Sequence, residues 1–152
     1  MLKVGDQVPE FETTDQNGNP FTLADIKGKK VILFFYPRDN TPTCTEEVCN
    51  LRDNYDQLVE MGYTLIGVSA DEVKKHQKFI AKYQLPFPLL ADTERNLIDK
   101  FGVWGPKQFM GREIIGIHRT TFIINSEGVI SHIFEKVKSK QHTAQIVEAL
   151  EN

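Results

Sequence analysis

The spacing of apolar positions changes from segment to segment along this chain, and the uninterrupted and alternating patterns predict strands. Two apolar runs, Val31–Tyr36 and Tyr63–Ser69, are typical of parallel strands that are buried on both faces. Residues 120–125 and 129–134 predict two further strands, which are close enough in sequence to form a hairpin. Apolar and polar residues also alternate on either side of Asn17-Gly18, a strong turn signal, which predicts an N-terminal β-hairpin.

Helical spacing marks the segments between these strands. The first buried strand should be followed by a helix, because five apolar residues recur there at helical spacing: Val48, Leu51, Tyr55, Leu58 and Val59. Residues 71–84 predict a second helix, and Asp92 is the predicted cap of a third helix that runs to about Phe101. Residues 86–90 predict a short extended segment, and residues 143–150 predict a C-terminal helix.

The resulting order is a β-hairpin, a βαβα unit, a short βα unit and a final ββα unit. Strand–helix alternation predicts parallel strands, and the late hairpin adds antiparallel ones. We therefore expect an α/β fold in which helices flank both faces of a mixed central sheet. The final ββα unit is the ending typical of a thioredoxin-like fold. The 152 residues are 40% hydrophobic and 26% charged, and they suit one domain spanning residues 1–152.

The charge balance argues against a nucleic-acid partner. Lys and Arg together number 18 and Asp and Glu 21, a net charge of −3, whereas nucleic-acid-binding domains usually carry a basic stripe. Lys136, Lys138 and Lys140 are the densest basic cluster, and we expect them in a solvated loop. The apolar runs are too short to span a bilayer, and the first residues do not resemble a signal peptide. We expect no membrane partner and a cytoplasmic location.

The two cysteines, Cys44 and Cys49, are candidates for redox or metal chemistry, because structural disulfides are rare in a reducing cytosol. They follow the first buried strand, in a segment where Thr41 is the expected N-cap of a helix and Pro42 its first residue. Cys44 should then lie in the first helical turn. Unpaired backbone N–H groups and the helix dipole favour a thiolate at that position.

Helix geometry separates the two cysteines. On a helical wheel Cys44 falls within the apolar arc and should face the protein body, whereas Cys49 points about 140° away from it. In an intact helix their Cα atoms would lie roughly 8.6 Å apart, and disulfides rarely tolerate more than about 7 Å. A bond between them therefore requires the start of the helix to unwind, which costs least at a helix end. The spacing alone equally allows both cysteines to be small core residues.

A metal site has little support in the sequence. Zinc and iron–sulfur sites usually take four ligands, and this chain has two cysteines. The four histidines show no ligand-like spacing near them: His76, His118, His132 and His142. We expect each histidine to be a surface or packing residue, and we expect no metal.

The segment around Cys44 carries a resemblance to a known family. Pro37, Thr41 and Cys44 stand in the Pro-x-x-x-Thr-x-x-Cys arrangement of the peroxiredoxin active-site loop, and the chain is most similar to the bacterioferritin-comigratory-protein (PrxQ) branch. The similarity extends over nearly the whole chain and includes four later segments: Asn50–Asp53, Phe101–Gly105, Phe109–Gly111 and Gly116–Phe122. Thr43 stands where many relatives have glycine, and we expect this departure to have a modest effect on the pocket.

The resemblance implies a thiol-specific peroxidase that reduces hydrogen peroxide and organic hydroperoxides. Cys44 would be the peroxidatic cysteine, whose thiolate attacks the O–O bond and becomes a sulfenic acid. Cys49 would be the resolving cysteine, which traps that sulfur as an intramolecular disulfide. Thr41 would hold the peroxide by hydrogen bonds, and Arg119 would place a permanent positive charge beside it. The resemblance makes five residues the substrate-binding set: Pro37, Thr41, Thr43, Cys44 and Arg119.

The resemblance also implies that thioredoxin or a similar dithiol is the reductant, that no organic cofactor takes part and that the protein is a monomer. Glu46 and Glu47 lie close to Cys44 in sequence, and their negative charges disfavour a thiolate. Arg119 would have to offset them. Glu47 is then either a brace for Arg119 or a simple partner of the helix dipole, and the sequence leaves both interpretations open.

Two other functions compete with the peroxidase. A thioredoxin-like dithiol–disulfide oxidoreductase would share the fold class, but that chemistry normally uses Cys-x-x-Cys, whereas four residues separate Cys44 and Cys49 here. A redox-sensing or binding module would be oxidised by peroxide but would not turn over.

Overall fold

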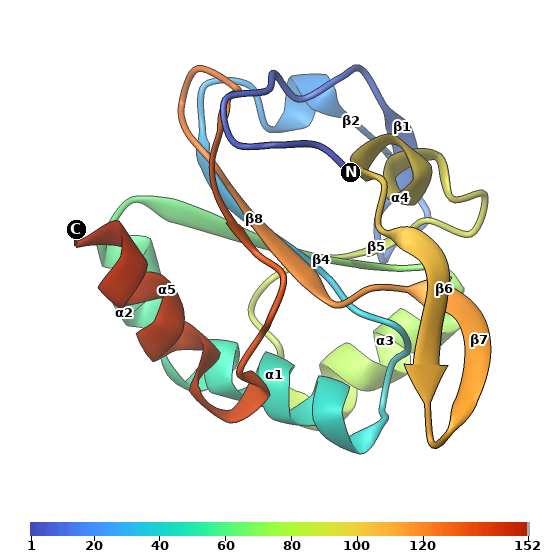
Figure 1. The fold of residues 1–152 in the computed structure, drawn as a ribbon. Coiled ribbons are helices and arrows are strands. Elements are labelled where there is room, and N and C mark those ends of the chain that lie inside the picture. The colour runs from blue at the N-terminus through green and yellow to red at the C-terminus, as the bar shows by residue number, and fades with distance from the viewer. Residues whose placement is uncertain (152) are drawn as a thin grey trace.

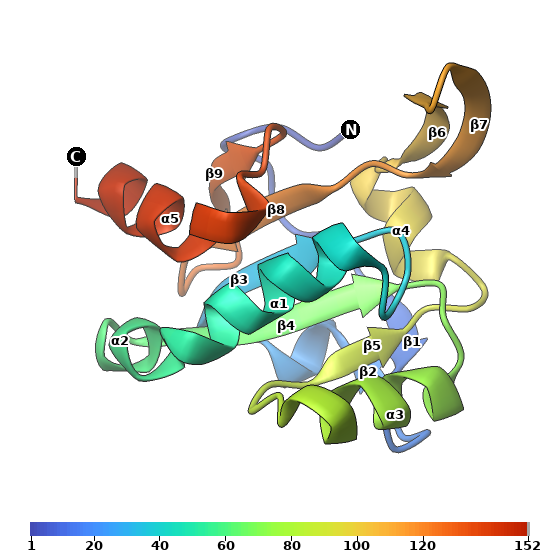
Figure 2. The ribbon, with the colours of Figure 1, turned by 90° about the horizontal axis from the view of Figure 1, so that it is seen from below.

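The central sheet of the computed structural model, which describes residues 1–151, has five strands in the order β5-β4-β3-β8-β9 (Figures 1 and 2). These strands are β3 (Lys30–Phe35), β4 (Tyr63–Ser69), β5 (Leu89–Ala91), β8 (Thr120–Ile124) and β9 (Ile130–Phe134). β3 pairs in parallel with β4, and β4 with β5, whereas the β3–β8 and β8–β9 pairs are antiparallel. The mixed sheet predicted from the sequence is confirmed.

Four helices cover one face of this sheet (Figure 2). They are α1 (Pro42–Asp53), α2 (Tyr55–Glu60), α3 (Val73–Tyr83) and α5 (His142–Leu150), the last preceded by the short 3-10 helix η2 (Ser139–Gln141). Within the described residues, no helix is long and apolar enough to cross a bilayer.

The opposite face is covered by α4 (Asn96–Phe101) and by the N-terminal segment. In that segment β1 (Glu12–Thr14) pairs antiparallel with β2 (Pro20–Thr22), followed by the 3-10 helix η1 (Leu23–Asp25). The predicted N-terminal hairpin and the predicted helices on both faces are therefore confirmed.

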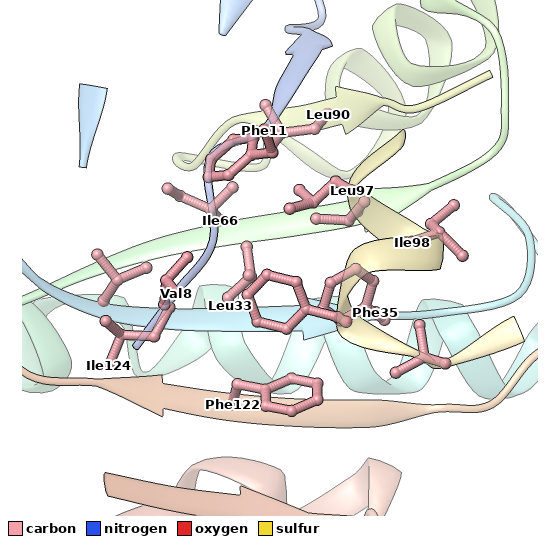
Figure 3. Packing of buried hydrophobic residues seen from close by; sticks show 14 of the residues in the cluster. Val8, Phe11, Leu33, Phe35, Ile66, Leu90, Leu97, Ile98, Phe122 and Ile124 are labelled. Carbon is pink, nitrogen blue, oxygen red and sulfur yellow. The ribbon is translucent and has the colours of Figure 1, made fainter. Parts of the chain in front are cut away.

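β3 separates two buried clusters, because its successive side chains point to opposite faces of the sheet. Phe34 belongs to the cluster that includes α1, and Phe35 belongs to the cluster that includes α4 (Figure 3). The ring of Phe101 lies 5.2 Å from that of Phe35 and 4.8 Å from that of Phe122, measured between centroids. Burying each such side chain contributes about 1.5–3 kcal/mol. The sheet is therefore a rigid base for the loop that follows β3.

The first helix is shorter than the sequence pattern predicts. α1 ends at Asp53 and α2 begins at Tyr55, because Asn54 leaves helical backbone geometry with φ −114° and ψ 16°. Its side-chain amide donates to the Asn50 carbonyl oxygen at 2.8 Å, a competition with the helix backbone that is typical of asparagine. The interruption leaves Val59 45% exposed, so the predicted place of Val59 on the buried stripe is wrong.

Asp92 is not the N-cap that the sequence predicts. α4 begins only at Asn96, after Arg95 adopts a left-handed conformation with φ 57°. The Asp92 carboxylate nevertheless accepts a hydrogen bond from the Ile98 backbone N–H and another from the Thr13 hydroxyl, both at 2.8 Å. Asp92 thus stabilises the start of α4 from outside the helix, and it also fastens α4 to β1.

A second hairpin, between α4 and β8, was not predicted. β6 (Trp104–Phe109) pairs antiparallel with β7 (Arg112–Ile117) through the turn Met110-Gly111, where both residues have positive φ. The hairpin projects from the body of the molecule (Figures 1 and 2). Most of its side chains are at least partly exposed. It therefore lacks the alternation of buried and exposed positions by which a strand is found in a sequence.

Candidate active site

Cys44 is the third residue of α1 and is almost completely buried, with 1% of its surface exposed. Thr41 is the N-cap of α1 and Pro42 its first residue, as predicted. The Thr41 hydroxyl donates to the Arg38 carbonyl oxygen at 3.2 Å and does not cap a backbone N–H of the helix. The N–H groups of the first turn thus remain available to stabilise negative charge beside Cys44.

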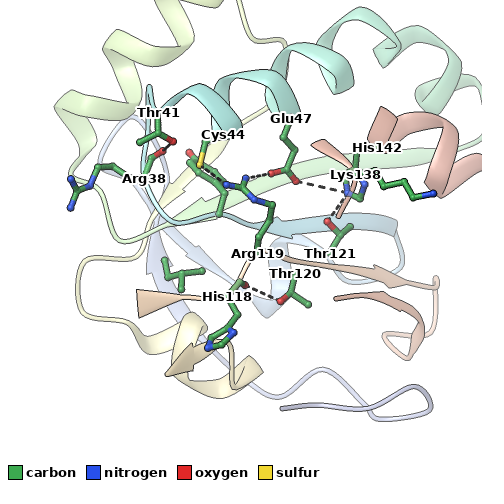
Figure 4. A network of polar contacts seen from close by, with 12 residues as sticks. Arg38, Thr41, Cys44, Glu47, His118, Arg119, Thr120, Thr121, Lys138 and His142 are labelled. Atoms are coloured by element: carbon green, nitrogen blue, oxygen red, sulfur yellow. Dashed lines mark hydrogen bonds and ion pairs between the residues drawn. The ribbon is translucent and has the colours of Figure 1, made fainter. Parts of the chain in front are cut away.

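Arg119 reaches Cys44 because strand β8 pairs with strand β3 in the central sheet. It directly precedes β8, whose first residue, Thr120, is paired with Phe35 at the end of β3. The loop to α1 departs from that end of β3, so the antiparallel pairing brings together two residues that are 75 positions apart. Nη2 of Arg119 donates to Sγ of Cys44 at 3.1 Å (Figure 4). The guanidinium thus places a permanent positive charge directly beside the sulfur.

Glu47 lies one turn after Cys44, and its side chain is fully buried. Its Oε1 accepts a hydrogen bond from Nη1 of Arg119 at 2.6 Å, which supports the interpretation of Glu47 as a brace. Burial raises the pKa of Glu47 to about 7, although the Arg119 charge and its hydrogen bond act in the opposite direction. Burial lowers the pKa of Arg119, but Glu47 and Cys44 together raise it above its ordinary value. Arg119 is therefore a fixed positive charge shared by two acidic groups.

Lys107, on β6, brings a second cation to the site, and nothing in the sequence singled it out. Its ammonium group donates to the Ile117 carbonyl oxygen at 2.7 Å. Burial lowers the pKa of Lys107, the charge of Arg119 lowers it further, and Cys44 raises it. The β6–β7 hairpin thus carries a cation on which the charges of Arg119 and Cys44 act.

The loop before α1 is held by a buried network that the sequence did not reveal. The Asp39 carboxylate accepts from the Tyr36 hydroxyl at 2.5 Å and lies 2.6 Å from Nδ1 of His76. The Asp39 backbone N–H donates to Asp71 at 2.7 Å, and Nε2 of His76 lies 2.9 Å from the Leu90 carbonyl oxygen. His76 is thus a packing residue, as expected.

The same network contains a possible set of metal ligands. One ligand atom from each of Asp39, Asp71 and His76 lies within 4.8 Å of the others. Two carboxylates and an imidazole could hold a divalent cation, but these atoms already serve as partners in the hydrogen bonds of the network. We therefore interpret Asp39, Asp71 and His76 as residues that hold the active-site loop in place.

Cys49 lies in the same helix as Cys44, and both are free thiols. Cys44 is buried, in keeping with a side chain that faces the protein body, and Cys49 is half-buried at the edge of the same apolar cluster. Burial raises the pKa of Cys49; the nearby Arg52 lowers it, and Asp53 adds to the rise. Cys49 is therefore kept in the thiol form while the helix is intact.

The remaining predicted residues divide into those near Cys44 and those elsewhere. Pro37 is half-buried and Thr43 is exposed, on the loop and first turn that carry Cys44. His118 is exposed, as expected of a surface residue. His142, at the start of α5, is buried with its Nε2 3.9 Å from Oε2 of Glu47. The sequence around His142 contains no motif that predicts its contact with Glu47.

Comparison with known proteins agrees with the geometry of the site. Residues 4–133 match the AhpC/TSA family. A putative peroxiredoxin bcp from Coxiella burnetii is 46% identical over 149 residues, which cover 98% of this chain and 99% of that protein. A mutant PrxQ structure from Xylella fastidiosa has a TM-score of 0.90 at 30% identity, covering 99% of this chain and 96% of its own. A Xanthomonas campestris bacterioferritin comigratory protein, studied for alkyl peroxide reduction, has a TM-score of 0.84 at 31% identity, covering 96% and 98%.

The chain belongs to the AhpC/TSA family. Within that family its resemblance to the Bcp and PrxQ peroxiredoxins, first seen in the motif around Cys44, is confirmed, and the thioredoxin-like fold with it. Its enzymatic class is that of a thiol peroxidase.

Proposed function

We propose that this chain reduces hydrogen peroxide and organic hydroperoxides at Cys44, with Arg119 as the group that activates both the sulfur and the peroxide. The observation that carries the proposal is the 3.1 Å contact between the Arg119 guanidinium and the buried Cys44 sulfur. Activity on organic hydroperoxides is supported by the Xanthomonas campestris relative studied for alkyl peroxide reduction.

In the first step the Cys44 thiolate attacks the terminal oxygen of the peroxide. An S–O bond forms as the O–O bond breaks, and the sulfur gives up two electrons. The transferred oxygen keeps its hydrogen as a sulfenic acid, and the departing oxygen takes up a proton and leaves as water or an alcohol. Arg119 stabilises the negative charge on that oxygen, because its several fixed N–H donors remain protonated throughout.

The loop and first turn of α1 would position the peroxide. The Thr41 hydroxyl hydrogen is used by the Arg38 carbonyl group, so its oxygen can accept a hydrogen bond from the peroxide O–H. Pro37 and Thr43 would form the adjoining walls. Glu47 would orient Arg119 through the 2.6 Å contact, and it acts on the reaction only through that side chain.

In the second step Cys49 condenses with the sulfenic acid, releasing water and forming an intramolecular disulfide. Both cysteines lie in one helix, so the first turns of α1 would have to unwind before the sulfurs can meet. Thioredoxin or a similar dithiol would then reduce the disulfide. The enzyme would act without a cofactor in the cytoplasm, where such reductants are found. A single domain spanning residues 1–152 would function as a monomer, since it supplies its own resolving cysteine.

The test is peroxide consumption coupled to thioredoxin and its reductase, in wild type, Cys44→Ser and Cys49→Ser. We expect turnover in wild type and none in Cys44→Ser. Cys49→Ser should accumulate a sulfenic acid that a dimedone probe traps, and it should lose thioredoxin-coupled turnover. Size-exclusion chromatography with light scattering tests the monomer.

Two results would contradict the proposal. Insulin reduction without peroxide turnover would identify a dithiol–disulfide oxidoreductase. Oxidation by peroxide in a single turnover, without re-reduction by thioredoxin or another dithiol, would identify a redox sensor.

A further inference from the structure

Among residues 1–151, one oxygen of the buried Glu47 carboxylate has no hydrogen-bond partner. Oε1 accepts from Arg119, but Oε2 forms no hydrogen bond with any of the described residues. Unsatisfied buried polar atoms are rare in folded proteins, and each needs a physical explanation. Across the site from Oε2, Nε2 of His142 lies 3.9 Å away (Figure 4).

The surroundings of His142 determine which of its ring nitrogens carries hydrogen. The Gln145 side-chain amide is fixed in orientation, because its Nε2 donates to the Lys136 carbonyl oxygen and its Oε1 accepts from the Lys138 backbone N–H. Oε1 of Gln145 lies 3.0 Å from Nδ1 of His142, so Nδ1 must be the donor. Nε2 of the neutral ring is then an acceptor, and the Thr121 hydroxyl donates to it at 2.7 Å.

His142 therefore has no N–H to offer Glu47, because its Nε2 carries no hydrogen and the single lone pair of that nitrogen is used by Thr121. Burial lowers the pKa of His142 to about 4; the hydrogen bond to Gln145 acts against this, and the charge of Arg119 adds to it. The ring is thus neutral at physiological pH. Among the other charged or titratable groups, Arg119, which precedes β8, acts directly on Glu47. Cys44, on the same helix as Glu47, acts on Arg119, and the charge of Arg119 acts in turn on Lys107 of β6.

We propose that His142 is a positioning residue for the reaction at Cys44, because it withholds a hydrogen-bond donor from Oε2 of Glu47 and so weakens the ion pair between Glu47 and Arg119. With a donor on both oxygens, the carboxylate would be fully ionised and would hold the guanidinium more tightly. With a donor on one oxygen only, more of the Arg119 charge acts on the Cys44 sulfur and on the leaving oxygen. The kinetic part of this inference rests on the proposed peroxidase function, but the effect of His142 on Glu47 does not.

The experiment replaces His142 with glutamine, whose amide nitrogen can occupy the place of the ring Nε2 and donate to Oε2. The protonation of Glu47 is followed by ¹³C NMR of labelled glutamate carboxyl groups from pH 5 to 9, with Glu47→Gln identifying the signal. The rate constant for oxidation of the reduced protein by hydrogen peroxide is measured over the same range by stopped flow. His132→Gln, at a half-buried histidine outside the site, is the matched control.

We expect the wild-type rate profile to contain a falling contribution centred at the Glu47 titration, which is absent in Glu47→Gln. In His142→Gln the Glu47 midpoint should fall by about one pH unit or more, since a hydrogen bond to a charged group is of that strength. The rate constant near pH 7 should fall with it, by up to about tenfold. The second variant combines Gln145→Leu with Thr121→Val, because together they remove the acceptor of the Nδ1 hydrogen and the hydroxyl paired with Nε2, which lets the ring carry hydrogen on Nε2 and offer it to Oε2 of Glu47. It should shift the midpoint in the same direction.

Unchanged midpoints in both His142→Gln and the Gln145→Leu/Thr121→Val double variant would overturn the inference. A uniform loss of rate at every pH with an unshifted Glu47 midpoint would also overturn it, since that is the signature of a purely structural residue. So would a shifted midpoint without any change in the rate profile. If wild type did not react with peroxide at all, the proposed function itself would fail, and the NMR titration would still report separately on the contact between His142 and Glu47.

Discussion

Replacing Glu47 with glutamine removes a buried charge while keeping the size of the side chain, and it should change how the stability of the protein depends on pH. The native protein binds a proton at Glu47 more tightly than the unfolded chain does, because burial raises the pKa of Glu47 from 4.5 to about 7. Between these two values the native state carries more protons than the unfolded state. The contribution of Glu47 to stability is therefore fully present below pH 4.5 and is lost as pH rises towards 7.

The size of this effect follows from the two pKa values. A difference of about 2.5 pH units, at about 1.36 kcal/mol for each unit, is about 3 kcal/mol. No reduction for solvent screening is needed, because the Glu47 side chain is fully buried. Relative to Glu47→Gln, wild type should thus lose about 3 kcal/mol of unfolding free energy between pH 4.5 and pH 7.

His142 makes the opposite contribution, which shows why the variant must be compared with wild type. Burial lowers the pKa of His142 from 6.5 to about 4, so the unfolded chain binds more protons between these values and stability falls as pH falls through them. In wild type the contributions of His142 and Glu47 largely cancel between pH 4.5 and 6.5. In Glu47→Gln the His142 contribution is no longer offset, and acid should weaken the variant by about 3 kcal/mol more than wild type.

Urea unfolding of the reduced proteins, in steps from pH 4.5 to 8, measures the two free energies. The same series on His132→Gln controls for a substitution of comparable size outside the site. A constant difference between wild type and Glu47→Gln across this range would refute the reasoning, since it would mean that Glu47 ionises in the native state as it does in the unfolded chain.

Three further outcomes are expected. Arg119→Lys keeps the charge but loses the planar set of donors, and it should lower the rate constant with hydrogen peroxide about 100-fold in stopped-flow measurements; an unchanged rate constant would remove Arg119 from the mechanism. Asn50→Ala removes the hydrogen bonds that its side chain makes with Lys140 (2.9 Å) and Thr143 (2.8 Å). It should lower the free energy of unfolding, measured in urea, by about 2 kcal/mol. An unchanged free energy of unfolding would mean that these hydrogen bonds do not stabilise the protein. Oxidation to the disulfide should speed amide hydrogen exchange across Thr45–Val48, and unchanged protection would contradict unwinding of α1.

Much of the fold could be predicted from local sequence patterns. The two apolar runs became the parallel strands β3 and β4. A strand buried on both faces must be apolar along its whole length, so its own composition reveals it. The hairpin β6–β7 could not be predicted in this way, since most of its side chains face solvent. The break at Asn54 was missed for a different reason. The apolar spacing continues across that position, and a side-chain hydrogen bond interrupts the backbone.

The sequence by itself determined where Cys44 lies and which way it points. The N-cap at Thr41, the proline after it and the apolar spacing of α1 are local features, and they place Cys44 in the first turn, facing the core. Only the tertiary structure decided what surrounds the sulfur. Arg119 comes to Cys44 from 75 residues away through the pairing of β8 with β3, and His142 comes to Glu47 through the packing of α5. No periodicity records such contacts, because they depend on strand order and helix packing, which arise only when the whole sheet has assembled.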